Sequence, residues 1–275
     1  MPLETEMEPH LEVVERLSNA VVVIVGLGGV GSWAAEAVCR SGVGNLVLID
    51  LDDICISNTN RQLHALSSTV GKMKIDEMAK RLNDINPDCN VTLIHDFVSP
   101  DNVDDVLLSI PGVTACLDAI DGAKGKSSLI AACSRHGIPI VTCGGSAGRT
   151  DPTKFVCDDL SRVSGDPLLS ACRKNLRRRY GFEEGISWRE KQDKKRKPPR
   201  KWNIKAVFSK EPQKALPRGS DSSSLRRCDG ALGTACFVTG TSGFVAAGQI
   251  IEMIANDNLS VPTNFPRNKA NMTAS

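Results

Sequence analysis

The feature that most constrains the fold is a glycine-rich turn that follows a short apolar run near the start of the chain. Val21–Val25 is too short for a helix and rich in β-branched residues, so it predicts a buried strand. A helical pattern opens at Trp33, and the residues between contain four glycines: Gly26, Gly28, Gly29 and Gly31. A strand, a glycine turn and a helix N-terminus form a cradle for phosphate, because backbone N–H groups face the anion and missing Cβ atoms let it approach. The turn therefore predicts a nucleotide site.

The same alternation of strand and helix continues through the first half of the chain. A second apolar strand at residues 46–49 ends on Asp50, where a carboxylate normally accepts hydrogen bonds from ribose hydroxyls. Further strands are expected at residues 85–94, 113–117 and 138–142, and helices at residues 70–84, 101–108 and 126–136. We therefore expect an α/β fold with a doubly wound, mostly parallel, Rossmann-like sheet and a C-terminal extension.

Length and charge suggest one domain with extensions. At 275 residues the chain is long enough to bury a large core. We expect an N-terminal helix, which could be truncated, at residues 1–19, a nucleotide-binding domain at residues 20–255 and a disordered tail at residues 256–275. Residues 173–205 form a basic excursion with a net charge of +10, which leaves −8 for the rest of a chain whose total is +2. This asymmetry predicts a localised surface for a polyanion.

The second half of the chain is less regular. Strands are expected at residues 155–157 and 202–208, with a helix at residues 167–179 between them. Residues 231–251 carry no charge and are long enough to suggest a transmembrane helix, but they contain four glycines. We favour a helix buried in the core and expect no stable membrane insertion.

The cysteines favour a reduced intracellular protein. The chain has ten cysteines, no CxxC pair and no signal peptide. Several of them lie in or beside apolar runs, and Cys236 lies among small and aromatic residues, so we expect buried thiols rather than a disulfide framework or a zinc site.

Residues downstream of Asp50 distinguish between two nucleotide chemistries. The glycine pattern with Asp50 also satisfies the dinucleotide fingerprint, but a hydride-transfer enzyme has no obvious use for Asn58, Arg61 and Lys74 near phosphates. An enzyme that splits ATP to activate a carboxylate needs such groups, since charge develops on the α-phosphate as pyrophosphate leaves. Asp121 follows the fourth strand and could hold Mg²⁺. Singly, each residue could be an ordinary strand end or surface charge, but together they favour ATP.

Four segments now carry a family resemblance: GLGGVGSWAAEAV, LIDLDDICISNTNRQ, VGKMKIDEMAKRLNDINP and DAID. They resemble the ubiquitin-activating-enzyme-like family, which adenylates carboxylates and includes sulfur-carrier adenylyltransferases. The Trp after GGVGS, the phrase SNTNRQLHAL and the stretch GGSAGRTDPTKFVCDDL resemble, more narrowly, its tRNA threonylcarbamoyladenosine dehydratase branch. The resemblance covers roughly residues 11–254 and is weakest in the basic excursion.

The resemblance implies a reaction and a set of roles. The reaction is ATP-dependent dehydration of threonylcarbamoyl-adenosine beside the tRNA anticodon, in which the threonyl carboxylate is adenylated and closed into a ring. Arg61, Lys74, Asp121 and Cys228 would be catalytic, with Asp121 also the Mg²⁺ ligand. The residues that would bind ATP are Gly26, Gly28, Gly29, Gly31, Asp50, Asp52, Ser57, Asn58, Arg61, Gln62, Lys74 and Asp118. The implied partners are the modified tRNA, a second copy of the chain and a sulfur-relay protein.

Cys228 and the basic run bear on the substrate. Arg226 and Arg227 flank Cys228 close to a helix N-terminus, which would lower the pKa of its thiol and suit a nucleophile, although an incidental surface thiol is equally compatible. The run could bind tRNA phosphates, with stacking by aromatic residues, or be a solvated loop. Its aromatic residues are Tyr180, Trp188 and Trp202.

One departure from the family and two alternative functions remain. Members usually carry an N-terminal arginine that reaches the ATP phosphates, often across a dimer, whereas the first arginine here is Arg16. The first alternative is an enzyme that activates the C-terminus of a ubiquitin-like or sulfur-carrier protein, although it would commonly have zinc-binding CxxC pairs. The second is a tRNA-binding module with impaired catalysis. We expect a cytoplasmic protein, or a mitochondrial one associated with the outer membrane.

Overall fold

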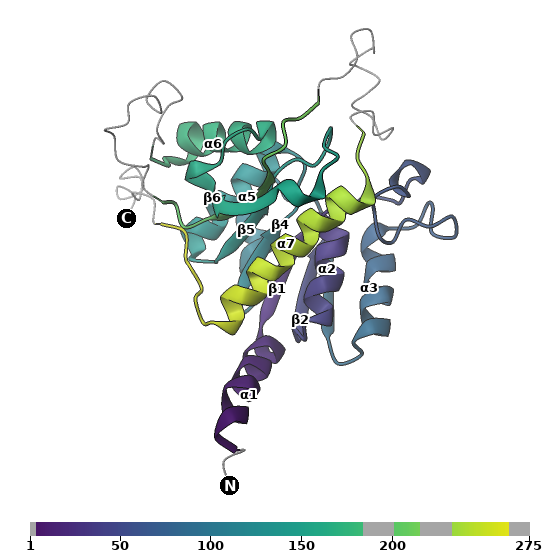
Figure 1. Ribbon diagram of the computed structural model, residues 1–275, viewed down its shortest axis with the longest axis vertical. Coiled ribbons are helices and arrows are strands. Elements are labelled where there is room, and N and C mark those ends of the chain that lie inside the picture. Colours follow the sequence, from purple (N-terminus) through teal and green to yellow (C-terminus); the bar gives the residue numbers. More distant parts are fainter. Residues whose placement is uncertain (1–3, 184–200, 215–232, 264–275) are drawn as a thin grey trace.

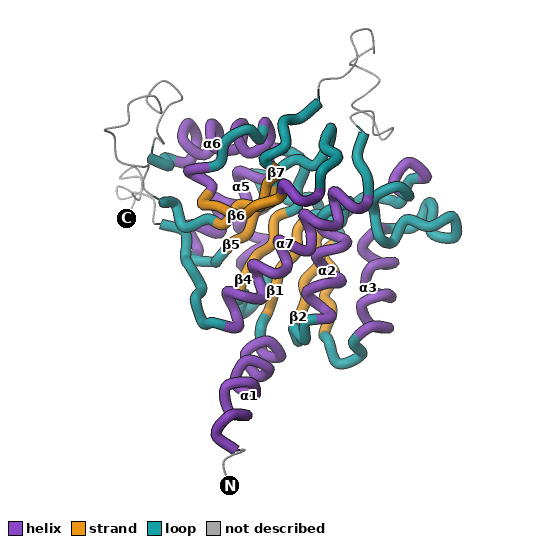
Figure 2. The backbone as a smooth tube through the Cα atoms, in the orientation of Figure 1, coloured by secondary structure: helices purple, strands orange, loops and turns teal. Residues whose placement is uncertain are grey.

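The computed structural model describes residues 4–183, 201–214 and 233–263 of the chain. One seven-stranded sheet runs through it in the order β3-β2-β1-β4-β5-β7-β6 (Figures 1 and 2). All neighbouring strands are parallel except β6 and β7, which are antiparallel. The strands are β1 (Val21–Val25), β2 (Asn45–Ile49), β3 (Asn90–Ile94), β4 (Ala115–Asp118), β5 (Ile140–Cys143), β6 (Phe155–Asp159) and β7 (Lys205–Ser209).

Helices cover both faces of this sheet. Within β1, Val22 and Ile24 face a core shared with α1, α2, α3 and α7, whereas Val23 and Val25 face a core shared with α4, α5 and α6. This alternation is the period of two that a pleated strand imposes, and it makes every residue of a central strand apolar. The helices are α1 (Glu4–Asn19), α2 (Gly31–Arg40), α3 (Lys74–Ile85), α4 (Val103–Leu108), α5 (Ala123–His136), α6 (Pro167–Tyr180) and α7 (Cys236–Ala255), with short 3₁₀ turns η1 (Ile56–Asn58), η2 (Pro152–Lys154) and η3 (Leu160–Arg162).

The strand order confirms the predicted doubly wound fold. The chain moves outward from β1 to β2 and β3, then crosses back to β4 on the other side of β1. At this switch point the loops after β1 and β4 diverge, which opens a crevice at the carboxyl ends of the strands. α1 leads into β1 at the opposite edge of the sheet, where the strands begin, and it projects from the body of the molecule (Figure 1).

The long apolar helix α7 packs across the sheet, as expected. It is long and apolar enough to cross a membrane by composition, but a helix from a soluble core passes the same test. Ala246, Ile250 and Met253 are buried in the core that α7 shares with α2 and β1. The opposite side of α7 leaves Phe237 and Phe244 about half exposed.

Three expectations about individual segments need correction. Cys236 is exposed rather than buried, because it is the first residue of α7 and precedes the turns that enter the core. Trp202 is buried against Phe182 and cannot stack on a nucleic-acid base. The tail, expected to be disordered from residue 256, contacts the body up to Thr263, whose backbone N–H donates to the Trp202 carbonyl at 3.0 Å.

Candidate nucleotide and active site

A cavity of about 730 Å³ opens at the carboxyl edge of the sheet, where the switch point predicts one. Its walls come from the glycine turn, the segment around η1, the loops after β4 and β5, and the N-termini of α3, α6 and α7. The lining residues that carry polar side chains are Asp52, Asp53, Cys55, Asn58, Arg61, Gln62, Lys74, Asp121, Cys143, Ser146, Arg149, Gln213, Thr234 and Thr239.

The glycine turn brings backbone to the floor of this cavity. Gly26 has a φ of +88°, a left-handed conformation that favours glycine. A Cβ on Gly31 would overlap the Gly26 carbonyl oxygen, so the first turn of α2 can approach β1 closely only because Gly31 has no side chain. Gly28 and Gly29 then line the cavity. The turn therefore has the geometry that the sequence predicts for a phosphate cradle.

Asp50 fixes the glycine turn through hydrogen bonds to the backbone. Its carboxylate oxygens accept hydrogen bonds from the backbone N–H groups of Leu27, at 2.6 Å, and Asp52, at 2.8 Å. The buried side chain does not line the cavity. In this structure Asp50 therefore fixes the backbone on either side of the glycine turn, and its predicted contact with ribose stays a prediction.

Arg61 is held in the cavity wall by contacts on two sides. Its Nη1 donates to the Ser57 carbonyl oxygen at 2.6 Å and to the Asn60 side chain at 3.1 Å. Its own carbonyl oxygen accepts from Trp33 Nε1 at 3.0 Å and from Thr239 Oγ1 at 3.3 Å. The indole of α2 and a hydroxyl of α7 thus position the backbone of a residue far from both in sequence.

Lys74 supplies a second positive charge in the wall. It is the first residue of α3, its side chain is buried, and its Nζ lies 2.6 Å from Asp52 Oδ2. The aspartate side chain is half exposed and also lines the cavity. A flexible carboxylate on a buried ammonium can be displaced by phosphate oxygens, which leaves Lys74 as a point charge for an anionic ligand.

Asp121 lies at the mouth of the cavity, just past β4. Desolvation by the surrounding protein raises the pKa of the Asp121 carboxyl above the usual value. The charges of Lys126 and Arg61 lower this pKa, and the charge of Asp166 raises it further. The Asp121 side chain nevertheless remains accessible to solvent. A carboxylate here, near the cationic wall, is placed to face a metal ion held on phosphate oxygens.

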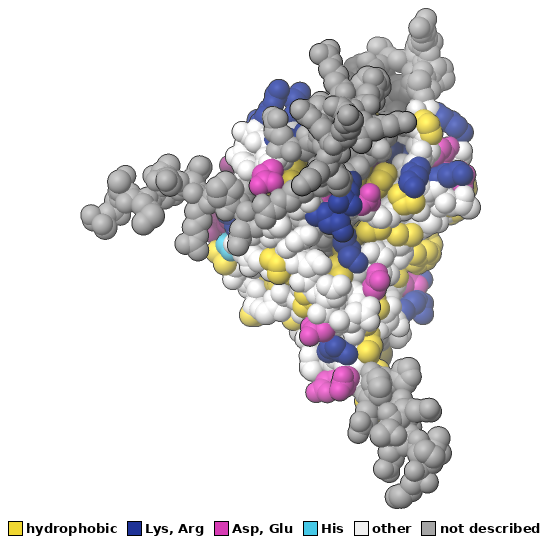
Figure 3. All heavy atoms as spheres, turned by 60° about the vertical axis from the view of Figure 1, so that its left-hand side comes forward, with side chains coloured by type: hydrophobic (Ala, Val, Ile, Leu, Met, Phe, Trp, Pro, Cys, Tyr) yellow, Lys and Arg dark blue, Asp and Glu magenta, His cyan; other side chains and the backbone are white. Residues whose placement is uncertain are grey.

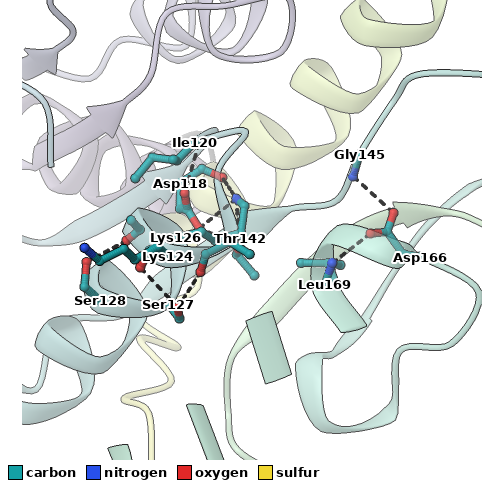
Figure 4. Close-up of polar contacts among 12 residues, drawn as sticks. Asp118, Ile120, Lys124, Lys126, Ser127, Ser128, Thr142, Gly145, Asp166 and Leu169 are labelled. Carbon is teal, nitrogen blue, oxygen red and sulfur yellow. Dashed lines mark hydrogen bonds and ion pairs between the residues drawn. The ribbon is translucent and has the colours of Figure 1, made fainter. Parts of the chain in front are cut away.

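Asp118 lies beneath this loop in a fully buried cluster (Figure 4). Its Oδ2 accepts from Lys126 Nζ at 2.9 Å and from Thr142 Oγ1 at 2.6 Å, and its Oδ1 accepts from the Ile120 backbone N–H at 3.1 Å. Burial alone would lower the pKa of Lys126. The negative charge and hydrogen bond of Asp118, combined with the effect of the neighbouring thiols, outweigh burial, so the pKa is raised. Asp118 is absent from the cavity lining, so its position suits support of the Asp121 loop rather than contact with a nucleotide.

The sequence-predicted residues divide into two groups. Lining the cavity are Gly28, Gly29, Asp52, Asn58, Arg61, Gln62, Lys74 and Asp121. Lying behind the lining are Gly26, Gly31, Asp50, Ser57 and Asp118. Cys228 lies outside the described residues, so its role stays a prediction.

Several lining residues escaped the sequence reasoning. The buried Arg149 is ion-paired at 3.1 Å with the buried Asp166, which lies in a segment without a local motif and does not itself line the cavity. Cys143 also lines the cavity, but burial raises the pKa of its thiol to about 12, so it is not a thiolate at neutral pH. The stretch GGSAGR after β5 was the one sequence pattern that could have predicted this part of the cavity lining.

The lining suits a polyphosphate ligand. Gln62 Oε1 is buried in the wall without a hydrogen-bond partner among the described residues, which is costly unless a hydroxyl or amino group of a ligand donates to it, since phosphate oxygens only accept. Backbone of the glycine turn, Arg61 and Lys74 supply donors and positive charge. Residues 4–183, 201–214 and 233–263 contain no group of three or more metal-ligating side chains. Mg²⁺ commonly combines one or two carboxylates with oxygens of a phosphate ligand.

Comparisons with known proteins agree with this geometry. The ThiF family model matches residues 6–274. The chain is 43% identical over 241 residues to the tRNA threonylcarbamoyladenosine dehydratase of Haemophilus influenzae, covering 87% of each chain. It also resembles two crystal structures of the Escherichia coli tRNA N6-threonylcarbamoyladenosine dehydratase, each covering 90% of both chains. The complex with AMP gives a TM-score of 0.76 at 38% identity, and the complex with ATP gives 0.75 at 37%.

The MccB enzyme of Escherichia coli, at 19% identity and a TM-score of 0.55, shares the fold. A family model that spans nearly the whole chain and relatives that match along nearly their whole length lead to one conclusion. This chain belongs to the ThiF family.

Proposed function

We propose that this protein catalyses the ATP-dependent dehydration of threonylcarbamoyl-adenosine in tRNA. The observation that carries the proposal is one cavity that brings together a glycine turn, two cations of its wall, Arg61 and Lys74, and the Asp121 carboxylate. Relatives that match this chain over nearly their full length are dehydratases of this nucleoside, and one of them binds ATP and AMP.

The chemistry divides into two steps. In the first, a carboxylate oxygen of the substrate forms a bond to the α-phosphorus of ATP, and the bond from that phosphorus to pyrophosphate breaks. In the second, an atom of the ureido group attacks the activated carbonyl, and AMP leaves with the former carboxylate oxygen. The sum is the loss of one water from the nucleoside, driven by cleavage of ATP.

Five of the lining residues have roles in the first step. The Gly28 and Gly29 backbone receives phosphate oxygens, while Arg61 and Lys74 neutralise the charge that grows on the leaving pyrophosphate. Asp121 would hold Mg²⁺ together with phosphate oxygens, which supplies charge neutralisation when the metal is bound. Because the pKa of Asp121 is raised, its carboxyl becomes protonated as the pH falls, and loses its metal-binding form, at a higher pH than an ordinary aspartate does.

The tRNA partner fits the basic helix α6. Its N-terminal residues Pro167 and Leu168 line the cavity, and its other end carries a cluster of positive charge. Lys174, Arg178 and Arg179 are exposed on it, and Figure 3 shows groups of Lys and Arg side chains on the upper part of this side of the molecule. Phosphates of a tRNA lying along α6 would lead its modified nucleoside toward the cavity.

The remaining arginines of α6 serve the fold. Arg173 Nη1 donates to the Val163 carbonyl oxygen, and burial lowers the pKa of Arg173. Arg177 lies over the Trp202 ring, 5.7 Å from its centroid. Within α6, the part of the predicted basic excursion that contacts tRNA is therefore confined, in this proposal, to the three exposed cations.

Assembly and location follow as further parts of the proposal. The half-exposed Phe237 and Phe244 on α7 offer an apolar face for a second copy of the chain, which light scattering would detect. The bacterial relatives that modify tRNA favour a cytoplasmic location. A sulfur-relay protein stays a predicted partner, with no described surface assigned to it.

The decisive experiment is turnover of modified tRNA. The protein, ATP and Mg²⁺ are incubated with tRNA that carries threonylcarbamoyl-adenosine, and the nucleosides are analysed by mass spectrometry. We expect loss of one water from the modified nucleoside and matching pyrophosphate release. Arg61→Ala should reduce the rate by about 10²–10³-fold, as for removal of one transition-state donor.

Two controls make this test specific. Arg40→Ala removes an exposed arginine at the end of α2, whose ion pair with Glu36 lies on the side of the sheet away from α6, so its rate should match the wild type. Unmodified tRNA and carrier proteins with a Gly-Gly tail should give no pyrophosphate. Release with a carrier protein instead would establish the alternative, activation of a ubiquitin-like or sulfur-carrier protein.

A further inference from the structure

Three loops follow one another along the carboxyl edge of the sheet. The glycine turn follows β1, the loop with Asp121 follows β4, and residues 144–149 follow β5. Because the strand order is β1-β4-β5, the Asp121 loop lies between the other two. The cavity therefore has a phosphate end at the glycine turn and a second end at residues 144–149, with Asp121 between them.

The second end holds buried hydroxyls that lack partners. Ser146 is 8% exposed, and its Oγ has no hydrogen-bond partner among the described residues. Thr234 Oγ1, which comes from the segment before α7, is likewise buried without a partner there. Both residues line the cavity. Leaving hydroxyls buried and unpaired is unfavourable, so each of these positions indicates a polar ligand group beside it.

Arg149 adds a donor to the same end. It is 2% exposed, its Nε donates to the Glu211 carbonyl oxygen at 3.2 Å, and its Nη2 donates to Asp166 Oδ2 at 3.1 Å. Its Nη1 makes no hydrogen bond to a described residue, and a Cβ on Gly145 would lie 3.8 Å from it. A guanidinium fixed at two of its nitrogens presents the third to an acceptor oxygen with little loss of side-chain entropy.

The loop that carries these groups is held rigidly. Asp166 accepts from the Gly145 backbone N–H at 3.1 Å and from the Leu169 backbone N–H at 2.9 Å, which joins the loop to the start of α6 (Figure 4). Glu211 accepts from the backbone N–H groups of Thr150 and Asp151, each at 2.8 Å. Rigid support on both sides is what a preorganised binding site requires.

We propose that Ser146, Arg149 and Thr234 form a subsite for the amino-acid appendage of the substrate nucleoside. The proposal rests on the proposed function and names the residues that recognise its substrate. The appendage carries a ureido group, a hydroxyl and a carboxylate, so it offers acceptors to the guanidinium and both donors and acceptors to the two hydroxyls. Its position beyond Asp121 leaves the glycine turn, Arg61 and Lys74 to ATP, and the carboxylate meets the α-phosphate between the two ends.

Equilibrium binding without ATP tests this subsite. The probe is an anticodon stem-loop, with and without the threonylcarbamoyl group, and the readout is the ratio of the two affinities. We expect the wild type to prefer the modified stem-loop and Ser146→Ala to reduce that preference about tenfold, the loss of one or two good hydrogen bonds. Affinity for the unmodified stem-loop and for ATP should not change, whereas structural damage would change both.

Matched variants complete the test. Ser164→Ala removes an exposed hydroxyl from the turn before α6 and should keep the full preference. Arg149→Gln should also reduce the preference, and Arg149→Lys should restore part of it; thermal melts verify that each variant folds. An unchanged preference in folded Ser146→Ala and Arg149→Gln would overturn the subsite. A wild type that prefers the modified stem-loop but never dehydrates it would overturn the proposed function and leave the subsite standing.

Discussion

His64 is a buried side chain with an unusual environment. It is 3% exposed, and neither ring nitrogen has a hydrogen-bond partner among the described residues. Burial lowers the pKa of its imidazole to about 4, and the positive charge of Lys74 contributes to this. The ring is therefore neutral at physiological pH, and it lies in the segment that carries Arg61 and Gln62 into the cavity wall.

This histidine predicts a loss of stability in acid. Its pKa is about 4 in the folded state and 6.5 as the ordinary value, so between these pH values the unfolded chain binds more protons. Stability therefore falls as the pH drops through this window, by about 3 kcal/mol in all. Urea denaturation at pH 7 and pH 4.5 measures this, and His64→Leu should lose most of the difference. His95→Gln, which changes an exposed histidine, should keep the full difference in free energy of unfolding between the two pH values. The same difference in the wild type and both variants would contradict the assignment to His64.

Sequence reasoning found site residues where they share one stretch of chain. Arg61 and Lys74 were predictable because they follow the glycine turn in an order that phosphate chemistry explains. Arg149 lies in the GGSAGR stretch, which carried a resemblance but no assigned role, and Asp166 has no local pattern, so neither was predicted; each gains its role from a partner in another loop. Asp50 was predicted as a ribose ligand because it ends a strand at the crevice, and Asp118 only through the family resemblance. In the structure their oxygens accept from backbone N–H groups and, at Asp118, from Lys126, and their contacts with a nucleotide stay predictions.

At the scale of elements, the contact between α2 and α7 shapes the site. A Cβ on Gly243 would lie 2.5 Å from the Val30 carbonyl oxygen and 3.1 Å from the Trp33 Cβ. α7 can therefore approach the N-terminal turn of α2, which follows the glycine turn, only with glycine at this position. The close approach also brings Thr239 to the Arg61 carbonyl oxygen.

Two glycines of α7 should respond in opposite ways to alanine. Gly243→Ala should destabilise the protein by about 1–3 kcal/mol through overpacking, and it should weaken nucleotide binding because α2 must shift. Gly248→Ala should stabilise it by about 0.5–1 kcal/mol, since a Cβ there meets nothing within 4 Å and alanine favours helix. Chemical denaturation of both variants measures the difference. Equal effects would show that the helices are less closely packed than described.

The elements themselves were largely predictable, with informative exceptions. β1 coincides with its apolar run, since a short β-branched run between a helix and a glycine turn has few alternatives. The strand expected at residues 202–208 instead begins at Lys205. Trp202 and Ile204 are apolar because they pack in the core, and their backbone N–H groups donate to the Asp159 carboxylate rather than to a strand. The antiparallel direction of β6 depends on the path of the chain, which periodicity does not encode.

At the scale of the whole molecule, charge is separated between two sides of the sheet. The exposed cations of α6 lie on the side covered by α4, α5 and α6. On the other side, Arg40 and Arg81 share Glu36, and Lys80 is paired with Glu77, so each of these cations has an acidic partner that partly offsets its charge. Lys174, Arg178 and Arg179 have no ion-pair partner among the described residues, and their charge marks the side that a polyanion would approach.

This asymmetry predicts a one-sided salt effect on tRNA binding. Lys174→Gln, Arg178→Gln and Arg179→Gln, combined in one protein, should lower the slope of log affinity against log salt by about 2–3, since each phosphate contact contributes about 0.9. Arg40→Gln, Lys80→Gln and Arg81→Gln, combined in a second protein, should leave the slope unchanged. Filter binding at several salt concentrations measures both. A larger effect from the second set would place the tRNA on the opposite side.

The order of strands in the sheet has a consequence for how the protein is made. β6 leaves the ribosome before β7, yet its only strand partner among the described residues is β7, which also pairs with β5. α7, which covers the central strands and contributes Thr239 to the cavity, emerges later still. A nascent chain shorter than about residue 255 would thus expose an apolar sheet face and lack a complete cavity. Ligand affinity would then be acquired only after α7 has been synthesised, and truncated chains without α7 would be substrates for proteolysis rather than competing binders.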